Sequence, residues 1–339
     1  MDFSNISKKQ LYLLGGGMAG VVALLALGFF LFGYNSFVVK GSGEDKVKAV
    51  SPLTGVECAT ATSRPFAVMV SSDREARPLS GISEADWVFE MPVVENGFTR
   101  MMAVYQCGLS AGAAPDRPLT VGSVRSARLD FTPLALGLHA IYAHFGGEHD
   151  ALAQLDAGII DNIDGLKYDG TYYYRQSGIP RPHNAFTDFD RLTEVSAKLK
   201  YDMADAKVSY THEAKSRSVG ELNPPELFNK KFRVVWTYDK TTNAYRRSRS
   251  GKPEVDKLTG QIVTVSNVVI LKTTWTPINR DYIRVKTVGA GGLLLYKNGT
   301  VVTGTWEKPT DQAKLTFYDQ NHKEIELAVG KVWVEIDAH

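Results

Sequence analysis

The sequence predicts an α/β or α+β N-terminal domain and a small antiparallel all-β C-terminal domain, behind one N-terminal transmembrane helix. Three observations predict this order: an apolar run without charge, a stretch where strand and helix patterns alternate, and a final stretch with strand patterns alone. With 339 residues, the chain is long enough for two domains and a tail. The predicted parts are a cytoplasmic tail at 1–10, an anchor at 11–34, a tether at 35–63, the N-terminal domain at 64–205, a linker at 206–230 and the C-terminal domain at 231–339.

The anchor is predicted from residues 11–34, which contain no charged residue and are long enough to cross a bilayer as a helix. Lys8 and Lys9 come directly before the run, so the positive-inside rule places the N-terminus in the cytoplasm and both domains outside the cell membrane. A cleaved signal peptide is the alternative. The run is longer than a usual signal core, and no clear cleavage motif follows it. The tether at 35–63 is rich in Gly, Ser and charged residues, which is typical of a flexible spacer.

The N-terminal domain is predicted from short apolar strands, two of which are followed by helix patterns. A third helix begins after Thr187 and Asp190, which form a capping-box pattern, and runs to about Tyr201. The expected strands are 66–71, 86–91, 99–106, 119–124 and 140–145, and the expected helices are 126–136, 148–157 and 189–201.

The C-terminal domain follows a polar linker that contains Asn223-Pro224-Pro225. Its short strand runs are separated by turn residues, and Asn298-Gly299 is the strongest hairpin signal among them. This spacing predicts a small antiparallel sandwich or barrel.

Composition excludes some partners and indicates one covalent link. The net charge of +2 comes without a basic stripe, so no nucleic-acid partner is expected. The only two cysteines, Cys58 and Cys107, both fall outside the predicted membrane helix, where disulfides persist. A bridge between them would fix the incoming tether to the sheet, and two free buried thiols are the alternative.

The first candidate site residues are Glu90, Glu95 and Arg100. Glu90 ends a predicted strand, and Asn96-Gly97 predicts a turn before the next strand, so a hairpin would bring one carboxylate near Arg100. Two carboxylates beside an arginine can act as an acid/base pair or hold a polar ligand. A structural ion pair within the hairpin is the alternative.

Arg125 and Arg128 are candidate anion-binding residues, because they lie at a strand-to-helix junction. Arginine is suited to bidentate contact with carboxylates and phosphates. Structural pairing with a nearby carboxylate, such as Glu90, Asp86 or Asp130, is the alternative.

The histidines complete the predicted site. His144 ends a strand before Gly146-Gly147, and His183 lies between two predicted elements in RPHNAF. Either can act as a general acid or base near neutral pH, or can be a buried structural histidine. A zinc site on His144, His149 and His183 matches no common spacing, so no metal is expected. The neighbouring residues Tyr174, Arg175 and Asn184 could line a groove for a sugar or peptide.

The motifs that carry these residues match a known family in their order. They are ARPLSGISEADWVFE, ENGFTR, GSVRSAR, RPHNAF, GTWEK and LAVGKVWVEI. The chain therefore resembles, from about Ser51 onward, the YerB-like family of bacterial envelope lipoproteins, which has paired N- and C-terminal domains of unassigned function. The resemblance implies an envelope location and a fold outline, but no chemistry. One feature departs from the family: no cysteine directly follows the apolar run, so an uncleaved helix is expected in place of a lipid anchor.

These observations lead to an expected function. Outside a bacterial membrane, an Arg/Glu/His site fits cell-wall polymer of the peptidoglycan type, which offers sugars, carboxylates and amines. Glycan cleavage is the enzymatic form of this expectation, with Glu90 or Glu95 as the acid, His144 or His183 assisting and the arginines holding the substrate. The alternative is a non-catalytic binding or scaffold module that regulates envelope enzymes. A third possibility is a structural protein whose charges are locked in ion pairs. No cofactor is expected for any of these roles.

Overall fold

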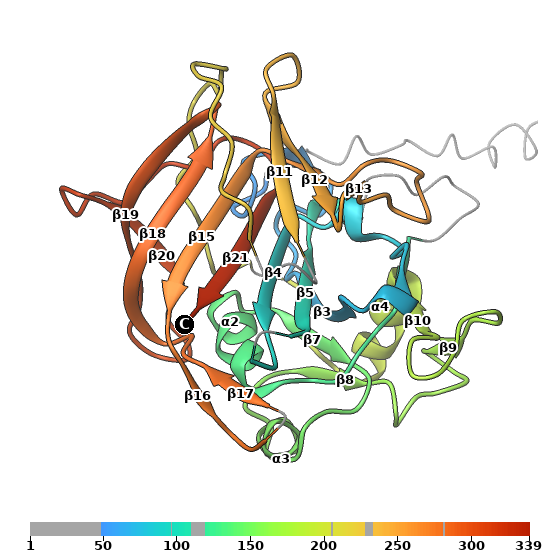
Figure 1. Cartoon of the computed structure of the whole chain (residues 1–339). Helices are drawn as coiled ribbons and strands as arrows, with labels where there is room; N and C mark the ends of the chain where they lie inside the picture. The colour runs from blue at the N-terminus through green and yellow to red at the C-terminus, as the bar shows by residue number, and fades with distance from the viewer. Residues whose placement is uncertain (1–48, 96, 110–118, 205, 228–232, 281) are drawn as a thin grey trace, which may run out of the picture. The chain divides into compact units, whose positions relative to one another are not determined.

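We describe the protein from a computed structural model, which covers residues 49–95, 97–109, 119–204, 206–227, 233–280 and 282–339. Within these residues the chain is mostly β, with few helices. Its main element is a mixed ten-stranded sheet in the order β20-β19-β18-β15-β21-β4-β5-β3-β7-β8 (Figure 1). The strands are β20 (Thr316–Asp319), β19 (Thr300–Lys308), β18 (Gly289–Lys297), β15 (Asn267–Thr273), β21 (Val332–Ala338), β4 (Trp87–Pro92), β5 (Thr99–Tyr105), β3 (Phe66–Ser71), β7 (Ile141–His144) and β8 (Asn162–Asp164).

Strand β21 joins the two halves of the chain into this sheet. It pairs in parallel with β15 on one side and in parallel with β4 on the other, so that Glu335 lies opposite Glu90. The strands of the C-terminal half therefore continue the sheet of the N-terminal half. The sequence predicted a separate antiparallel sandwich or barrel there, and it could not reveal a pairing between segments so far apart.

Smaller β elements cover the main sheet. A three-stranded sheet contains β6 (Thr120–Gly122), β10 (Ala185–Asp188) and β9 (Tyr174–Arg175), and an antiparallel sheet contains β11 (Val234–Asp239), β12 (Ala244–Arg249), β13 (Lys252–Pro253) and β14 (Thr264–Val265). Two hairpins complete the set: β1 (Ala49–Val50) with β2 (Glu57–Cys58), and β16 (Trp275–Pro277) with β17 (Ile283–Val285).

The described helices are short: α2 (Thr132–Gly137), α3 (His149–Asp156) and α4 (Phe189–Lys198). Four 3-10 turns accompany them: η1 (Arg74–Ala76), η2 (Ile82–Glu84), η3 (Cys107–Leu109) and η4 (Leu129–Phe131). The helix expected at 126–136 begins later, because residues 124–127 are held extended by backbone bonds such as Arg125 N–H to Met69 C=O. Helix α4 is capped by Asp188, whose carboxylate accepts from the Arg191 N–H, and not by Thr187, whose hydroxyl donates to the Tyr172 carbonyl.

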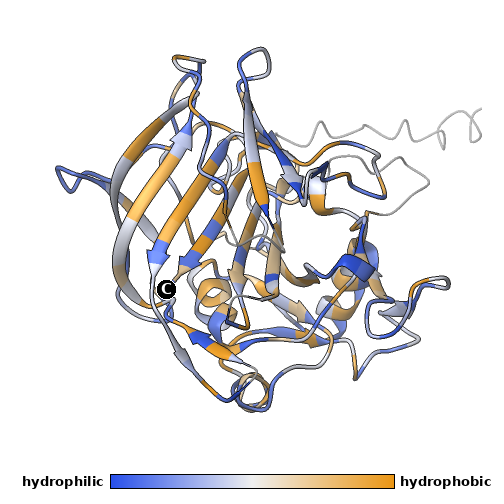
Figure 2. Cartoon of the chain, in the orientation of Figure 1, coloured by the Kyte–Doolittle hydropathy of each residue, from blue (hydrophilic) through white to orange (hydrophobic). Residues whose placement is uncertain are grey.

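Both faces of the sheet are buried along most of β3, β4, β5, β7, β15 and β21, which explains their nearly continuous apolar residues (Figure 2). Strands β18 and β19 alternate between exposed and less exposed positions over much of their length. On one face, side chains such as Met91, Met102 and Val104 pack against residues of α2 and α3. On the other face, Val88, Met101 and Tyr105 pack against α4 and the β11–β12 hairpin. Because successive strand residues point to opposite faces, one residue of register decides which environment a polar side chain enters.

The predicted anchor at 11–34 lies outside the described residues, and no helix within them is long and apolar enough to cross a membrane. The second part of the predicted tether is described, however. Residues 49–63 contain the β1–β2 hairpin, and Ser51, Leu53 and Ala61 within them are buried.

Candidate functional site

The end of strand β3 positions the candidate site. Residues 123–125 run along this strand: the Ser71 N–H donates to the Ser123 carbonyl at 3.0 Å, and the Arg125 N–H donates to the Met69 carbonyl at 2.8 Å. On the other side of β3, Arg100 of β5 lies opposite Ser71. The backbone thus brings Arg125 and Arg100 to the same end of β3.

Asp73 organises the side chains at this end. Its carboxylate accepts from the Ser71 hydroxyl at 2.8 Å and lies 3.7 Å from Arg100 Nη1. His183 Nδ1 lies 3.8 Å from the same carboxylate and 3.4 Å from the Ser71 hydroxyl. One acidic group therefore orients both a guanidinium and an imidazole.

We call Arg100, Arg125, Arg128, Asp73 and His183 the arginine cluster. Its positive charges exceed its negative ones, since Asp73 is its only carboxylate and Arg128 has one further ion pair, at 3.4 Å from Glu148. Burial and then the repulsion of Arg125 lower the pKa of Arg100 to about 10, against the attraction of Asp73. Burial also lowers the pKa of Arg125. The cluster therefore favours an additional negative charge.

The arginine cluster also contains buried donors without a hydrogen-bond partner. They are Arg100 Nε and Nη1, Arg125 Nε, and Arg128 Nε and Nη2. An unsatisfied buried donor costs about 1–3 kcal/mol, and more when it is charged. Carboxylate or phosphate oxygens would satisfy such donors in a bidentate manner.

The cluster is not closed to solvent. The side chains of Arg100, Asp73 and His183 are each between 11% and 13% exposed to solvent. The ring of Tyr282, from the β16–β17 hairpin, lies 4.5 Å from the Arg128 guanidinium and is itself exposed. The cluster therefore has a narrow exposed edge, whereas its donors without a partner are themselves buried.

Glu90 does not join this group. It lies opposite Met101 in the β4–β5 hairpin, so its side chain points to the other face of the sheet from Arg100. Its carboxylate accepts from Arg249 Nη1 at 2.7 Å, from Thr99 Oγ1 at 2.5 Å and from Arg247 Nη2, and it is fully buried. Burial opposes its ionisation, but Arg247 and Arg249 outweigh this effect and lower the pKa of Glu90 to about 2. All the acceptor positions of Glu90 are used for structure.

We call the group around Glu90 the buried ion network. Arg247 also contacts Glu254, which in turn contacts Arg77, and Trp236 Nε1 donates to Glu335 at 2.9 Å. Burial and the nearby charge of Glu90 raise the pKa of Glu335, which favours the protonated form of this carboxyl. This network could not be predicted from local sequence patterns, because most of its members come from the C-terminal half.

The other predicted acid and base residues are separate from the cluster. Glu95 is exposed in the turn between β4 and β5, beside a small pocket of about 240 Å³ that His339 also lines. His144 is fully buried, with Nδ1 2.8 Å from the Gly146 carbonyl and Nε2 3.2 Å from Asn162 Oδ1. His144 is thus held as a structural histidine.

The groove residues lie near His183 in the same loop but contact one another. Arg175 donates to Asn184 Oδ1 at 3.1 Å, pairs with Asp169 at 3.0 Å and lies over the Phe145 ring. The ring of Tyr174 lies under the Arg191 guanidinium. These contacts stabilise the loop that carries His183 into the cluster.

Sequence reasoning identified Arg100, Arg125, Arg128 and His183, but it missed Ser71 and Asp73. The available signal was the polar triplet Ser71-Ser72-Asp73 directly after a fully apolar strand. No group of three His, Cys, Asp or Glu residues that could hold a metal occurs within the part of the chain that the structure describes.

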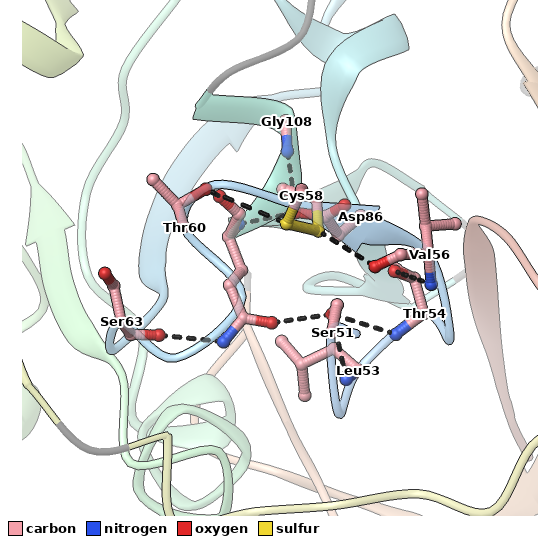
Figure 3. Close-up of a disulfide and its surroundings, with 11 residues drawn as sticks. Ser51, Leu53, Thr54, Val56, Cys58, Thr60, Ser63, Asp86 and Gly108 are labelled. Atoms are coloured by element: carbon pink, nitrogen blue, oxygen red, sulfur yellow. Dashed lines mark hydrogen bonds between the residues drawn. A yellow bond between two sulfur atoms is a disulfide. The ribbon is translucent and has the colours of Figure 1, made fainter. Parts of the chain in front are cut away.

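The predicted disulfide between Cys58 and Cys107 is confirmed, with Cα atoms 5.5 Å apart (Figure 3). It links β2 to the turn after β5. Next to it, the Asp86 carboxylate accepts from the backbone N–H groups of Gln106 and Gly108. The disulfide is therefore part of the scaffold that holds residues 49–63 against the sheet.

Fold and site together define a protein with a mixed ten-stranded sheet and an arginine cluster at the end of β3. The chain belongs to the family described as "Protein of unknown function (DUF3048)": the N-terminal domain model matches residues 53–202 and the C-terminal domain model matches residues 226–334. It is 30% identical over 330 residues to "Putative lipoprotein YerB" of Bacillus subtilis (strain 168), covering 93% of this chain and 94% of the relative. The crystal structure of the Bacillus subtilis YerB protein matches with a TM-score of 0.73 at 28% identity, over 85% of this chain and 96% of that chain. The resemblance to the YerB-like family is thus confirmed.

Proposed function

We propose that this protein is a membrane-anchored extracytoplasmic binding protein that holds a carboxylate-bearing cell-wall polymer at the arginine cluster. One observation carries the proposal: three neighbouring arginines have buried donors without hydrogen-bond partners, although Asp73 lies near Arg100 and Glu148 lies near Arg128. Peptidoglycan-type polymer presents carboxylates beside sugar rings and amides. Such a carboxylate would satisfy the free donors and offset the excess positive charge.

The geometry favours binding over glycan cleavage. Cleavage needs two carboxyl groups about 5–9.5 Å apart on either side of the scissile bond. Both oxygens of Glu90 accept from arginines on the other face of the sheet, and Glu95 is exposed between β4 and β5. Asp73 is engaged by Ser71, Arg100 and His183. We therefore assign these side chains to structure and recognition.

The proposal includes an uncleaved helix at 11–34 as the anchor, with both halves of the ectodomain outside. A lipid anchor needs a free cysteine near the start of the mature chain. The chain has two cysteines, and both are used in the Cys58–Cys107 disulfide. Protease added to intact spheroplasts should therefore remove residues 49–339 and leave a membrane-bound N-terminal fragment. Protection of the whole chain would contradict this topology.

Co-sedimentation tests the binding function. Full-length protein in detergent is mixed with insoluble peptidoglycan, and the bound fraction is measured as a function of polymer concentration. Arg125→Ala should weaken retention by about tenfold, because it removes a charge-assisted contact from a partly exposed position. Lys167→Ala, which removes an equal charge from an exposed residue near β8, is the control and should bind like the wild type. Equal retention of wild type, Arg125→Ala and the control would refute the proposal. Mass analysis of the supernatant shows at the same time whether fragments are released.

A further inference from the structure

One cavity among the described residues has Arg77 and Arg249 of the buried ion network in its lining. It is a cleft of about 990 Å³ between η1 and the β12–β13 hairpin. Its lining includes Arg74, Arg77, Arg249 and Lys252, with Phe98 and Val255 among its apolar residues. A volume of this size is in the range of small-molecule sites in proteins, which is about 300–1,000 Å³.

Charge in this cleft is not balanced. Arg77 and Arg249 reach it from the buried ion network, where Arg77 contacts Glu254 and Arg249 contacts Glu90. Arg74 and Lys252 add positive charge at the exposed edge, against Glu75 alone. The lining therefore has four basic residues against two acidic ones, Glu75 and Glu254.

Arg77 is the element that points to a ligand. Its guanidinium contacts Glu254, but its Nη2 atom is buried without a hydrogen-bond partner. Burial and then the repulsion of Arg249 and Arg247 lower the pKa of Arg77, which shows how closely the positive groups are packed. An anion at the base of the cleft would supply both an acceptor and the missing negative charge.

We propose that this cleft is a second binding site, for a ring-shaped ligand that carries a phosphate or carboxylate group. The anionic group contacts Arg77 at the base, with Arg74 and Lys252 at the edge. The ring lies against Phe98 and the prolines Pro78 and Pro253. This inference rests on residues of its own, because none of Arg74, Arg77 and Lys252 belongs to the arginine cluster, although η1 directly follows Asp73 in the chain.

Hydrogen exchange measured by mass spectrometry tests the proposal on the full-length protein. The probes are glucose 6-phosphate and glucuronic acid, which place a phosphate and a carboxylate on the same ring, and neutral glucose is the control. At least one acid should slow exchange several-fold in peptides covering 74–78 and 249–255, while glucose should not. The acid that protects identifies the preferred anionic group.

Variants localise the effect. Arg74→Ala combined with Lys252→Ala changes exposed edge residues and leaves the buried network intact. This double variant should need about ten times more ligand than the wild type to reach the same protection. The matched control, Lys167→Ala with Lys323→Ala, removes the same charge from sites beside the two outer strands of the sheet and should leave protection unchanged. The proposal is overturned if neither acid protects these peptides, or if the Arg74/Lys252 variant is protected as strongly as the control. Changes in peptides covering 123–128 report the arginine cluster instead, so failure of one site is distinguishable from failure of the other.

Discussion

Glu90 and Arg100 belong to the same β-hairpin but point to opposite faces of the sheet: Glu90 lies opposite Met101, and Arg100 lies opposite Met91. The two residues therefore serve different purposes. Glu90 neutralises arginines from the C-terminal half in a dry environment, whereas Arg100 joins a partly exposed cluster with excess positive charge. A shift of register by one residue would exchange these environments.

Glu90→Gln should destabilise the protein by about 3–5 kcal/mol, because it leaves Arg247 and Arg249 buried without their main counter-charge. Urea unfolding measures the change. Glu95→Gln removes the same charge from an exposed turn and should alter the free energy of unfolding by no more than about 0.5 kcal/mol. A Glu90→Gln protein as stable as Glu95→Gln would show that the buried network is not the stabilising element described here.

Glu335 should make stability fall as pH rises. Burial raises the pKa of this carboxyl to about 8 in the folded protein, above its usual value of 4.5. The contribution of the Glu335 carboxyl to the free energy of unfolding is complete below about pH 4.5. It is lost as pH rises through about 8, because this carboxyl ionises at lower pH in the unfolded chain than in the folded protein. Glu335→Gln keeps an acceptor for Trp236 and should flatten this slope between pH 5 and 8. The measurement is the free energy of unfolding of the wild type and of Glu335→Gln at pH 5 and at pH 8. If both proteins change equally between these pH values, Glu335 is not the group responsible for the pH dependence.

The disulfide should contribute about 4 kcal/mol to stability through the unfolded chain, since it links residues that are 49 positions apart. The double variant Cys58→Ser and Cys107→Ser should show this loss in chemical denaturation. The wild type measured under reducing conditions should approach the same value. If reduction and the double variant both leave the unfolding free energy unchanged, residues 49–63 are held by their other contacts alone.

Ligand binding at the arginine cluster should strengthen as pH falls. Burial lowers the pKa of His183, and Arg125 and Arg100 lower it further, against the attraction of Asp73 and Glu75. A bound carboxylate would offset the arginines, raise the pKa of His183 and favour its protonated form. The dissociation constant for a soluble peptidoglycan fragment should therefore be several-fold lower at pH 5.5 than at pH 7.5. His183→Gln should remove most of this pH dependence of the dissociation constant. If the variant shows the same pH dependence as the wild type, a group other than His183 is responsible for it.

The local elements of the N-terminal half could be predicted well from sequence. The apolar run 66–71 coincides with β3, and the predicted strands at 86–91 and 99–106 coincide closely with β4 and β5. Arg100, Arg125 and His183 were identified because polar residues at strand ends are unusual in an apolar pattern. Strand periodicity and turn residues are local properties, and a single sequence shows them directly.

Long-range pairing could not be predicted in the same way. Glu90 and Glu335 are neighbours only because β21 inserts in parallel beside β4. The apolar pattern of residues 332–336 shows that a strand forms there, but not which strand it joins. For the same reason the role of Asp73 was missed, since it depends on residues 123–125 lying along β3.

Calorimetric titration with a soluble peptidoglycan fragment tests the central claim most directly. The fragment is used in two forms, one with free carboxylates and one with the same carboxylates converted to amides. The recognition of carboxylates by Arg100, Arg125 and Arg128 predicts saturable binding of the acid form, at least about tenfold weaker binding of the amide form, and a similar loss for the acid form on Arg125→Ala. Equal affinity of the wild type for both forms, or no binding of either, would contradict the assignment of the arginine cluster as a carboxylate-binding site.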